Sequence, residues 1–362
     1  MGIIFSQSKA YRNLSVFDLT SLTEEEARLK LKELRWGPGE NTQCPSCEKN
    51  DKHYFIKTRK QWTCRYCKHR FSVTSTTPFS SHKISLVKIL FLVYSFISSP
   101  QGLSSNQFHS QIGASLKTIF LNFGKIREAI FETMLQSQMT GVVHVDCAHF
   151  CGKPRRANVR KKTDSYVLNN KLRNRKDGIV PDKSTHPEHW NVKKLEKRRI
   201  VLALSQCDTT EFDSTGSNRT LSFIINRESA KSILPIINKY IDKRALIMTD
   251  SGGAFKPIFS ELGITHLAVN HSERYIDNGV NNNMAESFFS RIRRAEFGTY
   301  NGMRPQYLAF YSAEFSWRND SKKLSLGEKL VDIFKRIFSR EPSKAFTNYG
   351  RGHRLGFEYI DD

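Results

Sequence analysis

The chain has 362 residues, of which 38% are hydrophobic, so it is long enough for two or three domains and too apolar for a disordered protein. Its 57 lysines and arginines exceed its 35 aspartates and glutamates by 22, and this surplus favours a polyanionic partner. The chain does not open on an arginine-led apolar signal, and its longest apolar stretch, from Ile84 to Ile97, is too short to span a bilayer, so we expect no membrane partner.

The first predicted element is a helix from Ala27 to Leu34. Thr23 and Glu26 have the spacing of a capping box, which satisfies two backbone N–H groups at the start of a helix. Gly37-Pro-Gly39 would end the helix. Residues 1–40 are therefore expected to form a helical lead-in.

Two CxxC pairs follow, Cys44-Pro-Ser-Cys47 and Cys64-Arg-Tyr-Cys67, separated by sixteen residues. This spacing is typical of four-cysteine zinc sites, in which two turns each supply two thiolates to a tetrahedral ion. We expect residues 41–80 to form a zinc ribbon in which these four cysteines hold a structural Zn²⁺. The alternatives are redox-active CxxC pairs and unpaired thiols. An odd total of seven cysteines also favours a reducing compartment over a disulfide framework.

Basic residues surround the two CxxC pairs, with Trp62 and Tyr66 among them. Such a mixture is typical of a surface that contacts phosphates. The alternative is a charged surface that only faces solvent. The basic residues are Lys57, Arg59, Lys60, Arg65, Lys68, His69 and Arg70.

Residues 81–138 are predicted to be largely helical, with apolar residues at three- and four-residue steps. Gln107 to Ile112, Gly113 and Ser115 to Phe123 follow the pattern helix, glycine turn, helix, with Ser115 as the N-cap. This pattern fits a helix-turn-helix whose second helix would present Lys117 to the major groove of DNA. It fits equally well an αα-hairpin packed in a core.

From Val142 onward, short apolar runs of strand length alternate with helical ones, which predicts an α/β (α+β) domain over residues 139–335. A basic insertion, residues 153–199, separates the first two strands and holds sixteen lysines and arginines against five acids. A helix with Pro235 in its first turn precedes the fourth strand. The expected strands are Val142–Asp146, Ile200–Leu204, Thr220–Ile225, Ala245–Thr249 and His266–Val269.

Three carboxylates of this domain form a candidate metal site. Asp146 and Asp250 each end an apolar strand, and open α/β sheets place reactive groups at that edge. Glu286 lies on a predicted helix, on one arc with Asn283 and Arg293 and opposite the apolar face. Carboxylate oxygens suit Mg²⁺, and three acids suffice for two-metal phosphoryl transfer if DNA phosphate completes the coordination. Taken singly, each acid also fits a helix cap or a surface ion pair.

Seven segments carry a recognisable pattern: Val145 to Phe150, Arg155 to Asn158, Met248 to Asp250, Asn270 to Ser272, Asn283 to Glu296, Gly298 to Tyr300 and Tyr307 to Arg318. They resemble bacterial insertion-sequence transposases of the DDE class. In particular they resemble the ISXO-like family, which carries a zinc ribbon and a helix-turn-helix before an RNase H-like catalytic domain. The resemblance covers roughly residues 20–355, and its motifs occur in the order and spacing of the family.

The resemblance implies a metal-dependent DDE transposase, an enzyme that cleaves the ends of an element and joins the 3′-hydroxyl to target DNA. Asp146, Asp250 and Glu286 would bind two Mg²⁺ or Mn²⁺ ions, with Asn283 and Arg293 as auxiliary catalytic residues. The implied partner is double-stranded DNA, both terminal inverted repeats and target, bound by a homodimer or higher oligomer in a cytoplasmic, nucleoid-associated setting.

DNA contacts are expected from the second helix of the helix-turn-helix, from the basic insertion and from the helix of Glu286. The residues are Lys117, Arg155, Arg156, Arg160, Lys161, Lys162 and Arg294. Residues 336–362 are expected to form a C-terminal tail. Two other functions remain open: a catalytically silent DNA-binding regulator derived from a transposase, and an endonuclease or resolvase on the same fold.

The sequence departs from the family at two site positions. Many relatives carry an acid where Cys147 stands, and lysine is common at the position of Arg293, where arginine keeps the charge but changes the phosphate geometry. Cys147, His149 and Cys151 suggest a second zinc site, but buried thiols and a hydrogen-bonded histidine are the better interpretation at the end of a strand.

Overall fold

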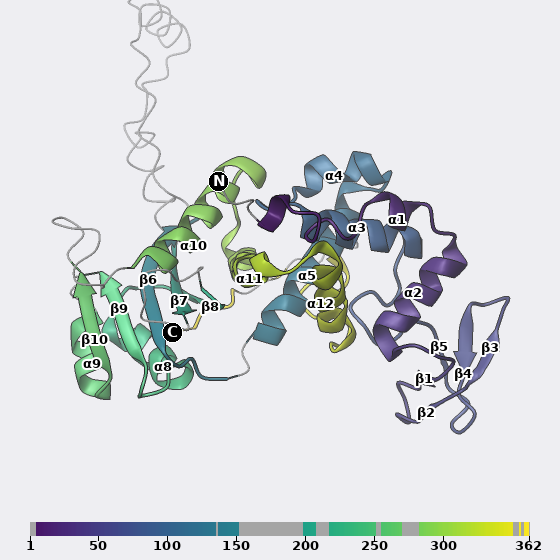
Figure 1. Cartoon of the computed structure of the whole chain (residues 1–362), viewed down its shortest axis with the longest axis horizontal. Helices are drawn as coiled ribbons and strands as arrows, with labels where there is room; N and C mark the ends of the chain where they lie inside the picture. Colours follow the sequence, from purple (N-terminus) through teal and green to yellow (C-terminus); the bar gives the residue numbers. More distant parts are fainter. Residues whose placement is uncertain are drawn as a thin grey trace, which may run out of the picture.

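The computed structural model describes residues 5–134, 137–151, 198–207, 217–250, 255–269, 282–349, 355 and 358–361. Most of the basic insertion lies outside the described residues, and with it the DNA contacts expected there, Arg155, Arg156, Arg160, Lys161 and Lys162. Figure 1 shows three regions side by side: a mixed sheet with its helices, a helical region, and a small region of short strands.

The N-terminal region contains η1 (Phe5–Gln7), α1 (Phe17–Thr20) and α2 (Glu24–Trp36). The predicted capping box is present at the start of α2. The hydroxyl of Thr23 accepts a hydrogen bond from the N–H of Glu26, and the N–H of Thr23 donates to the Glu26 carboxylate at 2.7 Å. Gly37, with φ of 84°, ends the helix as predicted.

Two small antiparallel sheets follow, one of β1 (Thr42–Gln43) and β2 (Asn50–Asp51), the other of β3 (Tyr54–Ile56), β4 (Gln61–Thr63) and β5 (Arg70–Phe71). Trp62 is only 5% exposed, and its ring packs edge-on against Trp36 of α2 with centroids 5.3 Å apart. The expectation that Trp62 belongs to a phosphate-contacting surface is therefore wrong. It is a core residue that attaches the strands to α2.

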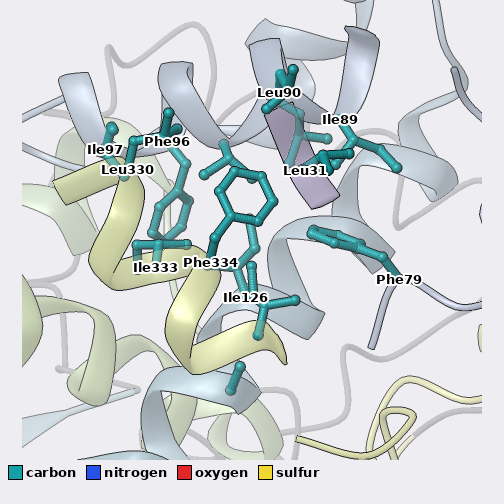
Figure 2. Close-up of a cluster of buried hydrophobic side chains, with 14 of the residues drawn as sticks. Leu31, Phe79, Ile89, Leu90, Phe96, Ile97, Ile126, Leu330, Ile333 and Phe334 are labelled. Atoms are coloured by element: carbon teal, nitrogen blue, oxygen red, sulfur yellow. The ribbon is translucent and has the colours of Figure 1, made fainter. Parts of the chain in front are cut away.

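Four helices, α3 (Leu86–Ser98), α4 (Ser105–Ile112), α5 (Leu116–Met134) and α12 (Leu326–Phe338), build the helical region around one apolar core. Figure 2 shows how Leu31 of α2, Phe96 of α3, Ile126 of α5 and Phe334 of α12 meet in this core. Burying such side chains is the dominant favourable contribution to folding. The C-terminal helix α12 is thus held against helices from the other end of the chain.

The predicted helix–turn–helix pattern is present as α4 and α5. Gly113 takes the left-handed conformation, with φ of 62°, and ends α4. Ser115 caps α5 by accepting a hydrogen bond from the N–H of Thr118 at 3.2 Å. Phe108 of α4 stacks on Phe123 of α5 in the shared core, while Lys117 is exposed on the first turn of α5. This geometry satisfies both interpretations, a packed hairpin and an accessible second helix.

The catalytic-domain candidate is a five-stranded sheet ordered β10-β9-β6-β7-β8. Its strands are β6 (Val142–Phe150), β7 (Arg199–Cys207), β8 (Arg219–Ile225), β9 (Leu246–Asp250) and β10 (Thr265–Val269). β7 is antiparallel to β6 and β8, while β9 is parallel to β6 and to β10. The sheet together with its helices confirms the predicted α+β class.

Helices cover both faces of this sheet. One face packs against α8 (Ala230–Tyr240) and α9 (Phe255–Leu262), and the other against α10 (Asn283–Arg294) and α11 (Leu308–Asp320). Between the last two lie a π-helical turn, η3 (Ala295–Thr299), and the short turn η4 (Pro305–Tyr307), while η5 (Ser321–Lys323) precedes α12. Side chains of β6 alternate between the two faces, as a pleated strand requires.

Two details differ from the sequence-based expectation. The strand expected to end at Asp146 continues to Phe150, because β7 pairs with all nine residues of β6. Pro235 lies inside α8 rather than in its first turn, since the helix begins at Ala230, where Ser229 accepts a hydrogen bond from the N–H of Ser232. Within the described part of the chain, every helix is too short or too polar to cross a bilayer.

Candidate functional site

The four cysteines of the small sheets converge as the spacing predicted. The sulfur of Cys44 lies 3.6 Å from that of Cys67, and the sulfur of Cys47 lies 3.5 Å from that of Cys64. A tetrahedral zinc ion with Zn–S bonds of about 2.3 Å needs sulfurs about 3.8 Å apart. The arrangement therefore fits a four-cysteine zinc centre and does not fit a pair of disulfides, since all four thiols are free.

The backbone around each pair of cysteines explains this convergence. The N–H of Glu48 donates to the carbonyl of Cys44 at 2.9 Å, and the N–H of Lys68 donates to the carbonyl of Cys64 at 3.2 Å. Both donors take the left-handed conformation, with φ of 58° and 62°. The two turns thus have the same shape, and each presents its two thiols to one point.

The outer surface of the ribbon combines aromatic and basic side chains. Tyr54 and Tyr66 are 60% and 58% exposed, and the guanidinium of Arg65 lies 5.2 Å from the ring of Tyr54. Aromatic rings and guanidinium groups together suit contacts with nucleic acid. The sequence indicated Tyr66 and Arg65 for this surface and did not single out Tyr54, which precedes the second cysteine pair by ten positions.

Asp146 and Asp250 occupy equivalent positions on neighbouring parallel strands. β6 and β9 pair from Val142 opposite Leu246 to His144 opposite Met248, so the two aspartates follow at the same step beyond the last pair. Neighbouring strands lie roughly 4.8 Å apart. Both aspartates also point to one face, because each lies two residues from a side chain on the α10 side of the sheet, Ala148 for Asp146 and Met248 for Asp250.

Glu286 reaches the same face of the sheet from α10. The apolar side of this helix, with Ala285, Phe288, Phe289 and Ile292, is buried against the sheet and α11, whereas Glu286 is exposed. A carboxylate in the first turn of a helix is also favoured by the helix dipole. The predicted amphipathic helix is therefore present, and it directs Glu286 away from its own core.

A cavity of about 620 Å³ lies between β6 and α10 and is lined by Asp146 and Glu286. Burial is the main reason why the pKa of Asp146 is raised to about 7; the hydrogen bond from the N–H of Cys147 opposes this rise, and the negative charges of Asp250, Glu286 and Glu228 contribute to it. The electrostatic coupling means that the three acids predicted from the sequence, together with Glu228, share one local environment.

Glu228 is an acid that the sequence did not single out. It follows β8 by three residues, at the edge where β6 and β9 also end, since both β6 and β8 are antiparallel to β7. Burial and the charge of Asp250 raise its pKa. The available signal was its place three residues after a predicted strand, which is weaker than the position at the strand end that indicated Asp250.

The acids are more widely spread than the thiols. Among the described residues, the four cysteines are the one group of three or more potential ligands whose donor atoms all lie within 4.8 Å of one another. Asp146 and Glu286 line one cavity, and Asp250 lies on the same face of the sheet as Asp146, but the donor atoms of the three carboxylates are farther apart than those of the thiols.

The predicted auxiliary residues lie along the same helix. Asn283 is exposed on the first turn of α10, one turn before Glu286. Arg293 and Arg294 line the cavity, and the guanidinium of Arg293 lies 5.9 Å from the ring of Phe150. Both arginines are exposed, which leaves their charges accessible to an anion in the cavity.

Of the two cysteines after Asp146, Cys151 is buried, as expected, whereas Cys147 is half-buried. Burial raises the pKa of Cys147, and it raises the pKa of Cys151 to about 12. The thiol of Cys151 donates to the carbonyl of Met303 at 3.1 Å. The expectation of a hydrogen-bonded histidine is wrong for one ring atom, because Nδ1 of His149 is buried and has no hydrogen-bond partner among the residues that the structure describes.

Two protein families match the chain. The ISXO2-like transposase domain matches residues 138–320, half of the chain, and this stretch contains Asp146, Asp250 and Glu286. The transposase zinc-ribbon domain matches residues 22–70, which contain α2 and the four cysteines. No curated protein matches the sequence.

Proposed function

Because the chain belongs to the ISXO2-like transposase family, we propose that it binds the terminal inverted repeats of a mobile element, cleaves the element's ends and joins the freed 3′-hydroxyl to target DNA. The observation that carries the proposal is the equal position of Asp146 and Asp250 on neighbouring strands, together with a helix that brings Glu286 to the cavity that Asp146 lines. Open α/β sheets bind their ligands at such an edge.

The donor atoms at this edge suit a hard divalent cation. The Asp146 carboxylate accepts a hydrogen bond from the N–H of Cys147, and within the described ranges no lysine or arginine forms an ion pair with it. Carboxylate oxygens are the ligands that Mg²⁺ prefers. Asp146, Asp250 and Glu286 would hold Mg²⁺ or Mn²⁺, which when bound supplies activation of the attacking oxygen and charge stabilisation at the phosphate.

The side chains around the acids position the DNA strand. Arg293 and Arg294 line the cavity beyond Glu286 and carry charges that suit phosphate oxygens, and arginine binds phosphate in a bidentate geometry. The buried apolar side of α10 fixes the helix on the sheet, so the acid and the arginines keep a constant spacing.

DNA binding is assigned to the N-terminal regions and to the basic insertion. Lys117 on the first turn of α5 and the ribbon surface of Tyr54, Arg65 and Tyr66 are exposed and face solvent. A structural zinc ion held by the four cysteines would keep that surface folded. The excess of 22 positive charges predicts that affinity falls steeply with salt, with log K decreasing by about 0.9 per phosphate contact for each log unit of salt.

The test uses the full chain and duplexes that carry the inverted repeats bordering its gene. With Mn²⁺ present, the wild type should nick these duplexes and should join a pre-cleaved end to a target plasmid. Asp146→Asn, Asp250→Asn and Glu286→Gln should bind with wild-type affinity and lose both activities by at least a thousandfold. Glu261→Gln, which changes an exposed acid on α9, is the matched control and should leave both unchanged.

The assay also separates the other two functions. Binding without nicking by the wild type, at the level of Asp250→Asn, would identify a silent DNA-binding regulator. Nicking without joining of a pre-cleaved end would identify an endonuclease or resolvase.

A further inference from the structure

Phe297 is an exposed aromatic side chain on the wall of the cavity that holds Asp146 and Glu286. It is 53% exposed. Single exposed apolar side chains are common and carry no meaning by themselves. Phe297 differs from Phe17 of α1, which is 77% exposed, because it lies beside the carboxylates rather than in the N-terminal region.

Three hydrogen bonds fix the backbone turn that carries Phe297. Phe297 lies in the middle of η3, whose π-helical bond runs from the N–H of Tyr300 to the carbonyl of Ala295 at 2.8 Å. The carboxylate of the buried Glu296 accepts a hydrogen bond from the N–H of Cys151 at 3.1 Å. Thr299 donates to the carbonyl of Gln101 at 3.1 Å. π-helical turns are rare and occur often at functional sites.

The exposed residues of α10 and η3 form a stripe along this cavity, and their chemistry changes from one end of the stripe to the other. Glu286, Ser290, Arg294 and Phe297 are all exposed and all line the cavity. From the carboxylate to the aromatic ring the stripe spans eleven residues, roughly 16 Å at 1.5 Å per residue. A strand bound along it would have the acid near the cleaved phosphodiester, the cation near a backbone phosphate and the aromatic ring near a base.

We propose that Phe297 stacks on an unpaired base of the DNA strand that lies along α10, within about five nucleotides of the cleavage point at 3.4 Å per nucleotide. The inference rests on the proposed function, because it takes DNA as the ligand of this cavity. A volume of about 620 Å³ is sufficient for a nucleotide-sized group. Stacking on an aromatic ring accepts any base, so the contact would hold the strand without reading its sequence.

The test is a binding cycle between one side chain and one base. The full chain, with Ca²⁺ in place of Mg²⁺, is titrated with inverted-repeat duplexes whose five nucleotides nearest the cleavage point are left unpaired. Each of the five bases is removed in turn to give an abasic site. Removal of one particular base should weaken wild-type binding about tenfold. Phe297→Ala should bind the intact DNA about tenfold more weakly and should be indifferent to the loss of that base.

Two variants complete the design. Phe297→Trp should retain both the affinity and the sensitivity to the missing base, and Phe17→Ala should behave as the wild type. The inference would be overturned if the wild type and Phe297→Ala bound the intact DNA with equal affinity. It would also be overturned if, at each of the five positions, removing the base weakened binding of Phe297→Ala as much as binding of the wild type. Since binding is measured without catalysis, the result is separate from the proposed function, which fails instead if the wild type neither nicks nor joins DNA with Mn²⁺.

Discussion

Neutralising Glu314 tests whether one buried ionic network joins the helical region to the sheet. Glu314 of α11 is fully buried, and its carboxylate accepts hydrogen bonds from Arg127 of α5 at 2.6 Å, from Arg318 at 2.8 Å and from the hydroxyl of Tyr300 at 3.0 Å. Both guanidiniums are almost completely buried. The variant Glu314→Gln keeps the shape of the side chain and removes the charge.

The expected loss follows from the two cations that remain. Removing one partner of a buried ion pair destabilises a protein by about 3–5 kcal/mol, because it leaves a charge without compensation. Glu314 has two such partners, so we expect about 5 kcal/mol, which is the entire stability of a marginal domain. Urea unfolding at pH 7, followed by tryptophan fluorescence, measures this loss. Asp242→Asn, which breaks the pair of a half-buried carboxylate with the exposed Arg244, is the control and should change stability by at most about 1 kcal/mol.

The stability difference between wild type and Glu314→Gln should depend on pH, and this dependence identifies the ionic network as its cause. Burial alone would raise the pKa of Glu314, but the guanidiniums of Arg127 and Arg318 hold it below its usual range. A lowered pKa in the folded state stabilises the protein fully above the ordinary carboxyl pKa of about 4.3, and this contribution disappears as the pH falls further. The difference between wild type and Glu314→Gln should therefore narrow below about pH 4. A loss under 1 kcal/mol at pH 7, or one that does not depend on pH, would refute the reasoning.

Three further predictions concern separate regions. Chelating the metal from purified protein, or changing Cys44 to Ser, should release one zinc per chain and weaken end binding, as measured by metal analysis and gel shift; unchanged binding by metal-free protein would contradict a structural zinc ion. Burial raises the pKa of Asp320 to about 7. The free energy of unfolding of the wild type should therefore fall as pH rises from about 4 to 7, because the buried carboxyl must then lose its proton. Asp320→Asn, which can still accept the N–H of Thr220, should match wild-type stability at pH 4 and exceed it at pH 8 by up to ~4 kcal/mol in urea unfolding, and an equal difference at both pH values would oppose this. Lys117→Ala should reduce the slope of log K against log salt by about 1 without altering which end is preferred, whereas an unchanged slope would favour the packed-hairpin interpretation of α4 and α5.

The elements that sequence analysis predicted well depend on local chemistry. The capping box of Thr23 and Glu26 and the glycine turn at Gly113 act over three or four residues, so the sequence alone contains the necessary information. The same holds for the strand ending at Asp250 and for the two-sided helix of Glu286, whose apolar period is visible in one segment.

The features that were missed depend on distant partners. β6 runs to Phe150 because β7 pairs with it, and this strand lies beyond the basic insertion. Trp62 is buried by Trp36, which belongs to a separate helix. Phe297 depends on a π-helical turn held by Cys151 and Gln101, and no local residue pattern specifies such a turn. Spatial neighbours, rather than propensity, determine these three.

The length of α5 has a mechanical consequence for the DNA. The helix has 19 residues and measures about 28 Å, with Lys117 on its first turn and Arg127 bound to α11, which itself packs on β8. If the proposed function holds, α5 sets a fixed distance between the DNA segment that Lys117 contacts and the phosphodiester that is cleaved. The spacing between these two points would then be a fixed property of the element's ends, and the choice of cutting position would belong to the protein rather than to the DNA sequence at the cut.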